Sequence, residues 1–342
     1  MKKIKVEESF DSLDSKFKGE AVVMETLTKK QKMTRIRQMI GRDKKLAVKE
    51  GRGSILKFGN DSSVGVTKFS TFNCEGLDSL GNIPHGRFTV LAGPEQCGKT
   101  TAAHRAVTSC QQTGGIVAWI DVESQLDPLW AEKQGNNIEE LLVIDPNSFN
   151  EPTLEAYLDK YRELTVKSLV DMVVIDSVTA LGSLGELKDK KGSRSLEDDT
   201  IALQARKLSQ FFRVATGITS KANCATVLIA QVRTPIGQYG KFESVPGGNA
   251  LKHYCSFRLL FRRGKKADAP TSKGKYIGFS SVVKVDKGRS LTVTEGDEKM
   301  IPFYFGEGYR AKSEGKLLVT AKEKEGDLEE VWEDIIVKEK KK

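Results

Sequence analysis

Short apolar runs alternate with longer stretches of helical periodicity between residues 86 and 255. The runs predict strands at Arg87–Leu91, Ile116–Asp121, Leu141–Ile144, Met172–Asp176 and Thr226–Ala230. Apolar positions three or four apart predict helices at Lys99–Gln111, Pro152–Thr165 and Asp198–Thr219. Because the strands are nearly continuous apolar runs, they predict a mainly parallel sheet that helices bury on both faces.

After residue 255 the apolar runs become shorter and more strand-like. They fall at Phe257–Phe261, Tyr276–Val285, Leu291–Val293 and Phe303–Phe305. We interpret them as an antiparallel extension of the same sheet, which gives an α/β fold class. The last 30 residues are highly charged, with a helical pattern over Leu328–Val337.

Residues 1–50 have sparse apolar positions that recur loosely at helical spacing. They predict a mobile start followed by one or two amphipathic helices, which form a small N-terminal helical arm. Gly51-Arg52-Gly53-Ser54 interrupts this pattern.

Charge is unevenly distributed along the 342 residues. The net charge is +9 (55 − 46), and residues 1–59 supply 16 Lys and Arg against 8 Asp and Glu, or +8. A basic arm favours a polyanionic partner, although excess lysine also serves solubility. The apolar fraction of 38% is large enough for a sizeable core, which excludes wholesale disorder.

Other classes of protein are disfavoured by the same sequence. No run approaches 18 apolar residues, and the first residues lack a hydrophobic segment, so we expect neither a membrane helix nor a secretory signal. The five cysteines are scattered without a CxxC pair, which is typical of reduced thiols in a cytoplasmic protein. The three histidines lack metal-ligand spacing, and we expect no structural zinc.

The strongest chemical motif follows the first predicted core strand and opens a helix. It fits G-x-x-x-x-G-K-[ST] and comprises Gly93, Pro94, Glu95, Gln96, Cys97, Gly98, Lys99, Thr100 and Thr101. Such a loop turns its backbone N–H groups toward phosphate oxygens at a helix N-terminus. Lys99 is expected to reach the β- and γ-phosphates of a nucleotide, and the Thr100 hydroxyl is expected to ligate Mg²⁺.

Two further strands end in carboxylates. Met172–Asp176 is an apolar strand whose terminal Asp176 is expected beside the metal. Asp121 and Glu123 follow another strand, and either carboxylate is able to orient the attacking water or to cap the following helix. Spacing alone does not choose between them.

These residues carry a resemblance to the RecA family of recombinases, including phage-encoded relatives, over roughly residues 51–310. The resembling segments stand in the family's order, at 51–59, 93–101, 120–128, 174–181, 229–233 and 247–252. The resemblance implies a RecA-type P-loop ATPase core that binds ATP and Mg²⁺. It also implies the domain limits: a basic arm at 1–50, an ATPase core at 51–310 and a charged tail at 311–342.

The resemblance implies roles for individual residues. Glu123 becomes the base for the hydrolytic water, and Gln231 senses the γ-phosphate and couples ATP to DNA affinity. Asp127 and Trp130 take the positions of adenine contacts, although Trp130 also suits ordinary core packing. Lys287 and Arg289 resemble the basic pair that reaches the phosphates of the neighbouring subunit; a solvated basic turn is the alternative.

DNA contacts are implied for two loops, 185–199 and 234–246, and for the residues around them. Basic side chains bind phosphates without regard to sequence, and aromatic rings stack on bases. The implied DNA-binding residues are Lys188, Lys190, Lys191, Arg194, Arg206, Arg213, Arg233, Tyr239, Lys241, Gly247, Gly248 and Asn249. Arg206 and Arg213 lie seven apart on one helix and therefore share a face.

The sequence departs from the bacterial pattern beyond the core. Only 34 residues follow the core match near 306–308, which is too short for the bacterial C-terminal domain that gathers duplex DNA. We therefore expect the basic arm to take part either in subunit docking or in duplex binding.

The function that the resemblance implies is an ATP-dependent DNA recombinase. It would form helical filaments on single-stranded DNA, exchange strands with homologous duplex DNA, and work with single-strand-binding and mediator proteins in the cytoplasm, or in the host cytoplasm if a phage encodes it. The alternatives are a ring-forming ATPase of the same fold, such as a helicase motor, and a non-catalytic recombination mediator.

Overall fold

A computed structural model describes residues 28–51, 55–59, 65–66, 68–150, 152–181, 196–232, 248–289 and 293–310. The side chains are described over the same ranges, except for 196–205, 248 and 249. By contacts the chain divides into two compact units, residues 1–65 and 66–342. No helix in the described ranges is both long and apolar enough to cross a membrane.

The first unit contains helix α1 (Lys29–Lys49). Thr28 and Gln31 form a capping box at its start, which satisfies backbone N–H groups that have no partner within the helix. The Asp43 carboxylate accepts hydrogen bonds from the backbone N–H groups of Ile55 and Leu56, at 2.6 and 3.0 Å. This contact fastens the segment after Gly51 to the helix.

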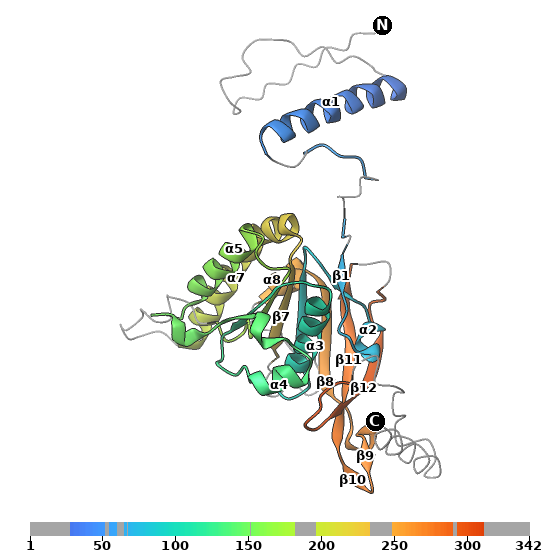
Figure 1. The fold of residues 1–342 in the computed structure, drawn as a ribbon, viewed down its shortest axis with the longest axis vertical. Helices are drawn as coiled ribbons and strands as arrows, with labels where there is room; N and C mark the ends of the chain where they lie inside the picture. The colour runs from blue at the N-terminus through green and yellow to red at the C-terminus, as the bar shows by residue number, and fades with distance from the viewer. Residues whose placement is uncertain are drawn as a thin grey trace. The chain divides into compact units, whose positions relative to one another are not determined.

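The second unit (Figure 1) contains a large central sheet. This sheet has eight strands in the order β12-β11-β8-β3-β7-β6-β4-β5. Its strands are β3 (Phe88–Gly93), β4 (Val117–Asp121), β5 (Leu141–Ile144), β6 (Met172–Asp176), β7 (Ala225–Gln231), β8 (Cys255–Arg263), β11 (Gly278–Gly288) and β12 (Glu298–Tyr304). All pairs from β8 to β5 are parallel, whereas β11 is antiparallel to both β8 and β12. The predicted parallel sheet with an antiparallel extension is confirmed. The extension begins one strand later than predicted, because Phe257–Phe261 lies in β8, which is parallel to β3.

Helices cover both faces of this sheet. Helices α2 (Glu75–Asp78) and α3 (Lys99–Gln112) pack on one face, and α5 (Leu154–Val166), α7 (Leu196–Ala222) and α8 (Gly248–Tyr254) pack on the other. Successive residues of β3 alternate between the two cores, with Leu91 in one and Val90 in the other. Both faces of the strand are therefore apolar, which explains its continuous hydrophobic run.

Smaller elements complete the unit. They are β1 (Phe69–Ser70), β2 (Ile83–Pro84), α4 (Pro128–Lys133), η2 (Ile138–Glu140), η3 (Pro146–Ser148), η4 (Lys266–Asp268), β9 (Thr271–Ser272) and β10 (Lys275–Tyr276). The sequence pattern missed most of them because each is too short to show a period. One predicted strand, Tyr276–Val285, is instead the end of β10 followed by the longer β11. The predicted elements Leu291–Val293 and Leu328–Val337 fall wholly or mostly outside the described residues.

Candidate functional site

The phosphate loop joins β3 to α3 at the carboxyl edge of the parallel sheet. Gly98, just before the helix, has a left-handed φ of 95°. A Cβ atom at this position would stand 2.1 Å from the Tyr309 hydroxyl, which itself donates to Ser281 at 2.7 Å. Both the conformation and the close approach therefore require glycine.

Lys99 and Thr100 open helix α3 beside two different strands. The buried Lys99 ammonium donates to the Pro94 carbonyl and lies 3.7 Å from the Cys97 sulfur. The Thr100 hydroxyl donates to Asp176 Oδ2 at 3.1 Å, which brings the phosphate loop against the end of β6.

The electrostatics around Asp176 favour a cation. Loss of hydration raises the pKa of Asp176 to about 7, and the nearby Glu123 and Asp121 carboxylates act in the same direction. The Thr100 hydrogen bond and Lys99 oppose this rise. A divalent cation beside these acids would hold Asp176 ionised, so the site fits Mg²⁺.

Asp121 and Glu123 have different surroundings. The Asp121 carboxylate accepts hydrogen bonds from the backbone N–H groups of Gln125 and Leu126, at 3.1 and 2.9 Å. Asp121 is buried and closes the turn after β4, whereas Glu123 is only half-buried. The structure thus separates a turn-capping carboxylate from one that faces the site.

Glu123 belongs to a hydrogen-bonded cluster that crosses three strand ends. Ser177 donates to Glu123 at 2.5 Å, and the Gln231 amide donates to the two Glu123 oxygens at 3.3 and 3.5 Å. Thr179 completes the cluster, because its hydroxyl lies 2.9 Å from that of Ser177 and accepts the Gln231 backbone N–H at 3.2 Å. Ser177 and Thr179 were not among the predicted site residues, although two hydroxyls directly after a buried strand were a usable signal.

A cavity of about 310 Å³ lies beside the phosphate loop, with Phe279, Phe303 and Phe305 in its wall. Asp127 caps α4 by accepting from the Leu129 and Trp130 backbone N–H groups, and the half-buried Trp130 ring lies 6.5 Å from that of Phe303. The three phenylalanines were not among the predicted site residues, although two of them stand in the aromatic run at 303–305. Together they give the loop an apolar, aromatic border.

Lys287 and Arg289 contact the C-terminal end of α8. Lys287 donates to the carbonyls of Lys252 and His253, the latter at 3.2 Å, and Arg289 reaches the His253 carbonyl at 3.4 Å. Cations at a helix C-terminus are favoured by the carbonyls that have no partner within the helix. Within one chain, the described side-chain hydrogen bonds of this pair go to α8 and not to the phosphate loop.

The expected DNA-binding residues are only partly visible. Lys188, Lys190, Lys191, Arg194, Arg233, Tyr239, Lys241 and Gly247 lie outside the described residues. Gly248 and Asn249 begin α8, where only their backbone is described. Arg206 and Arg213 are exposed on α7.

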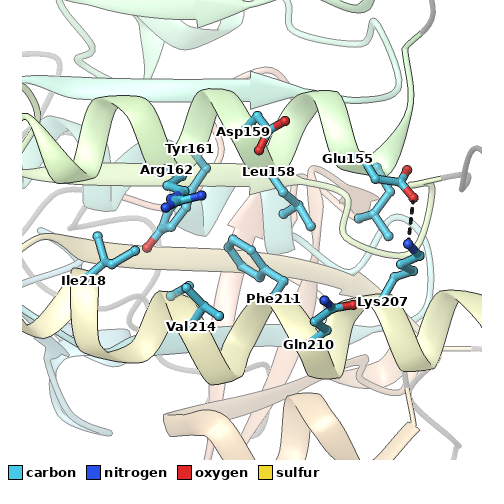
Figure 2. Close-up of a pocket in the computed structure, with 12 residues that line it drawn as sticks. Glu155, Leu158, Asp159, Tyr161, Arg162, Lys207, Gln210, Phe211, Val214 and Ile218 are labelled. Atoms are coloured by element: carbon cyan, nitrogen blue, oxygen red, sulfur yellow. Dashed lines mark ion pairs between the residues drawn. The ribbon is translucent and has the colours of Figure 1, made fainter.

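A second cavity, of about 290 Å³, lies between α5 and α7 (Figure 2). Leu158, Phe211 and Val214 form apolar walls, and the Glu155–Lys207 ion pair, at 3.5 Å, lies at one end. None of its lining residues belongs to the phosphate loop. It is therefore separate from the nucleotide site.

Comparison with known proteins identifies the family resemblance independently. The model of the RecA N-terminal domain matches residues 38–309. Protein RecA of Thermus aquaticus is 38% identical over 263 residues, which cover 75% of this chain and 73% of the relative. Protein RecA of Clostridium tetani (strain Massachusetts / E88) is 37% identical over 243 residues, or 70% of this chain and 65% of the relative.

Two further matches were found. Protein RecA of Rickettsia bellii (strain RML369-C) is 39% identical over 244 residues, which cover 70% of this chain and 67% of the relative. A crystal structure of the RadB recombinase matches with a TM-score of 0.49 and 22% identity, over 70% of this chain and 97% of that one.

Proposed function

This chain belongs to the RecA family, and we propose that it is an ATP-dependent recombinase that assembles on single-stranded DNA and exchanges strands with a homologous duplex. The observation that carries this proposal is the contact between Glu123 and Gln231. Glu123 stands beside the phosphate loop, and Gln231 ends β7 directly before the second proposed DNA loop, 234–246. Glu123, which is proposed to act on ATP, thereby contacts Gln231, which leads into the proposed DNA-binding loop 234–246.

The phosphate loop binds ATP in this proposal. Lys99 exchanges its Pro94 carbonyl partner for the β- and γ-phosphates, and Thr100 with Asp176 holds Mg²⁺. Bound Mg²⁺ supplies charge neutralisation for the phosphate oxygens. The existing Thr100–Asp176 hydrogen bond of 3.1 Å supports this assignment, since it already brings the two metal-site residues together.

Hydrolysis depends on Glu123 as the base that orients the attacking water. Ser177 fixes the direction of its carboxylate through the short hydrogen bond described above, and Gln231 adds two longer ones. In this proposal the Gln231 amide also contacts the γ-phosphate of bound ATP. When that phosphate leaves, Gln231 loses this contact, and the start of the 234–246 loop is released. ATP binding and DNA binding are then linked equilibria that strengthen one another.

Assembly completes the ATP site. Lys287 and Arg289 are proposed to reach the nucleotide of a neighbouring subunit, where they add positive charge near the γ-phosphate. Their contacts with the end of α8 support this role, because α8 begins directly after Gly247 at the end of the second loop region. The same pair would connect the neighbour's ATP to the DNA-binding segment through α8.

The decisive experiment is strand exchange between single-stranded DNA and matched or mismatched duplexes, with ATPase activity measured in parallel. We expect exchange with the matched duplex only, and hydrolysis that single-stranded DNA stimulates. Closed rings without filaments in electron micrographs would favour the helicase-type alternative. Hydrolysis that is absent, or indifferent to DNA, would favour a mediator.

The variant Lys99→Ala tests the assignment of the phosphate loop. Removing the ammonium should lower ATP turnover by at least about a hundredfold, because the lysine contacts the phosphates that carry charge in the transition state. The variant should keep the unfolding temperature of the unmodified chain. Turnover that survives the substitution would show that the phosphate loop is misassigned.

A further inference from the structure

Arg263 is the last residue of β8, the strand that pairs with β3 in parallel. Both strands therefore end at the same edge of the sheet, and Arg263 emerges beside the phosphate loop that follows β3. The Arg263 side chain lines the 310 Å³ cavity together with Gln96, Thr100 and Thr101. Neither the sequence motif nor the family resemblance pointed to this residue.

Two contacts hold the Arg263 guanidinium in place. Its Nε donates to the backbone carbonyl of Gln96 at 3.0 Å, within the phosphate loop itself. Its Cζ atom lies 4.4 Å from the centre of the Phe279 ring, and that ring stacks on Phe303 with centroids 4.5 Å apart. A cation stacked on an aromatic face is stabilised by the ring's negative charge density and loses less freedom when it binds a ligand.

The orientation leaves donors for a ligand. The Nε–H is used by Gln96, but among the described residues the two terminal NH₂ groups of Arg263 have no hydrogen-bond acceptor. The described residues that line the cavity include two cations, Lys99 and Arg263, and no carboxylate. This balance of charge is complementary to an anion, and planar NH₂ pairs match phosphate oxygens in two-point hydrogen bonds.

We propose that Arg263 binds the phosphate chain of the nucleotide within its own subunit, as a second cation beside Lys99. This inference rests on the proposed ATP site and adds to it a phosphate-binding residue from β8. Because the Arg263 Nε–H donates to Gln96, a movement of the phosphate loop would also move the guanidinium.

The neighbouring arginine provides a matched control. Arg262 is also exposed and also lies at the end of β8, but successive strand residues point to opposite faces. Its NH₂ group pairs with Glu298 at 2.9 Å, on β12, and it does not line the cavity. Arg262→Ala removes the same charge from the same strand without touching the proposed contact.

The test is equilibrium binding of fluorescent ATP and ADP analogues to the full chain in Mg²⁺, with adenosine as a competitor. Arg263→Ala should weaken ATP and ADP binding on the order of ten- to a hundredfold, as expected for a lost charge-assisted hydrogen bond, and should leave competition by adenosine unchanged. Arg263→Lys should recover part of the loss, because lysine restores the positive charge but not the planar pair of NH₂ donors. Arg262→Ala should bind both nucleotides like the unmodified chain.

Three outcomes would overturn the inference. They are unchanged ATP affinity in Arg263→Ala, an equal loss for adenosine, and a loss confined to DNA binding measured without nucleotide. Failure of the proposed function looks different, because the unmodified chain itself would then bind no ATP and Lys99→Ala would change nothing. Circular dichroism and thermal unfolding of each variant establish that the exposed substitutions leave the fold intact.

Discussion

Gln231 is a single amide through which hydrolysis and DNA binding are expected to communicate. Its bonds to Glu123 are long, at 3.3 and 3.5 Å, so its loss should disturb the carboxylate only mildly. We predict that Gln231→Ala keeps the DNA-free ATPase rate within about threefold but abolishes stimulation by single-stranded DNA. The measurement is the steady-state ATPase rate with and without DNA.

Gln125 offers the matched control for this prediction. Its side chain is an exposed amide, and within the described part of the chain its one hydrogen bond runs from the backbone N–H to Asp121. Gln125→Ala should retain the full response to DNA. If Gln231→Ala retains it as well, Gln231 does not couple the two sites.

At the residue scale, the sequence predicted which residues have a chemical role better than it predicted which residues contact one another. The phosphate loop motif located Lys99 and Thr100 because its glycines and lysine have a fixed spacing. The choice between Asp121 and Glu123 required three dimensions, since both carboxylates follow the same strand and only the backbone turn at 125–126 distinguishes them. Arg263 was missed because its importance comes from strand pairing between β8 and β3, which leaves no local motif.

At the scale of elements, α3 is fastened to the segment after α4 by a buried histidine. His104 Nδ1 lies 2.7 Å from Asn136 Oδ1, and the imidazole stacks on Trp119 with centroids 4.3 Å apart. Burial lowers the pKa of His104 to about 4, although the hydrogen bond to Asn136 acts in the opposite direction. The folded protein therefore holds this histidine neutral at moderately acidic pH.

The sign of the pH effect follows directly. Between about pH 6.5 and pH 4 the unfolded chain binds a proton at this histidine that the folded chain does not, so stability falls as pH falls through that window. For a change from pH 7.5 to pH 5 the contribution is a loss of about 2 kcal/mol in the free energy of unfolding. Urea denaturation of the unmodified chain and of His104→Gln at both pH values measures it.

The glutamine variant should be less stable at pH 7.5, because it loses the stacking on Trp119, but its stability should fall less on acidification. Other groups titrate equally in both proteins and cancel in the comparison. Identical losses in the two proteins would mean that folding does not lower the pKa of His104.

Sequence patterns predicted the long elements well and the short ones poorly. Strands β5 and β6 begin and end at the predicted residues, because polar residues on both sides delimit each apolar run. The prediction that Phe257–Phe261 belongs to the antiparallel extension was wrong on one side, because β8 is parallel to β3 and antiparallel only to β11. An apolar run records burial of a strand and not the direction of its neighbours.

At the scale of the whole molecule, the sheet has one notable edge. Among the described strands β5 pairs only with β4, and Leu142 and Val143 are 44% and 39% exposed. An edge strand with exposed apolar side chains and unpaired backbone groups is a template for pairing with another chain. Interfaces between copies cannot be recognised from periodicity, because their apolar residues are few and scattered.

We predict that this edge contributes to filament assembly. Val143→Lys places a charge on the edge, where it opposes strand addition, and should reduce assembly on single-stranded DNA by at least about tenfold in protein concentration. Sedimentation and electron microscopy in the presence of an ATP analogue measure the effect. Val166→Lys adds the same charge at an exposed position at the end of α5, away from the edge, and should assemble normally. If both variants assemble like the unmodified chain, β5 is excluded from the interface. If both assemble equally poorly, the defect comes from added charge in general. ATP binding by the monomer should be unchanged in both, since neither residue lines the nucleotide cavity.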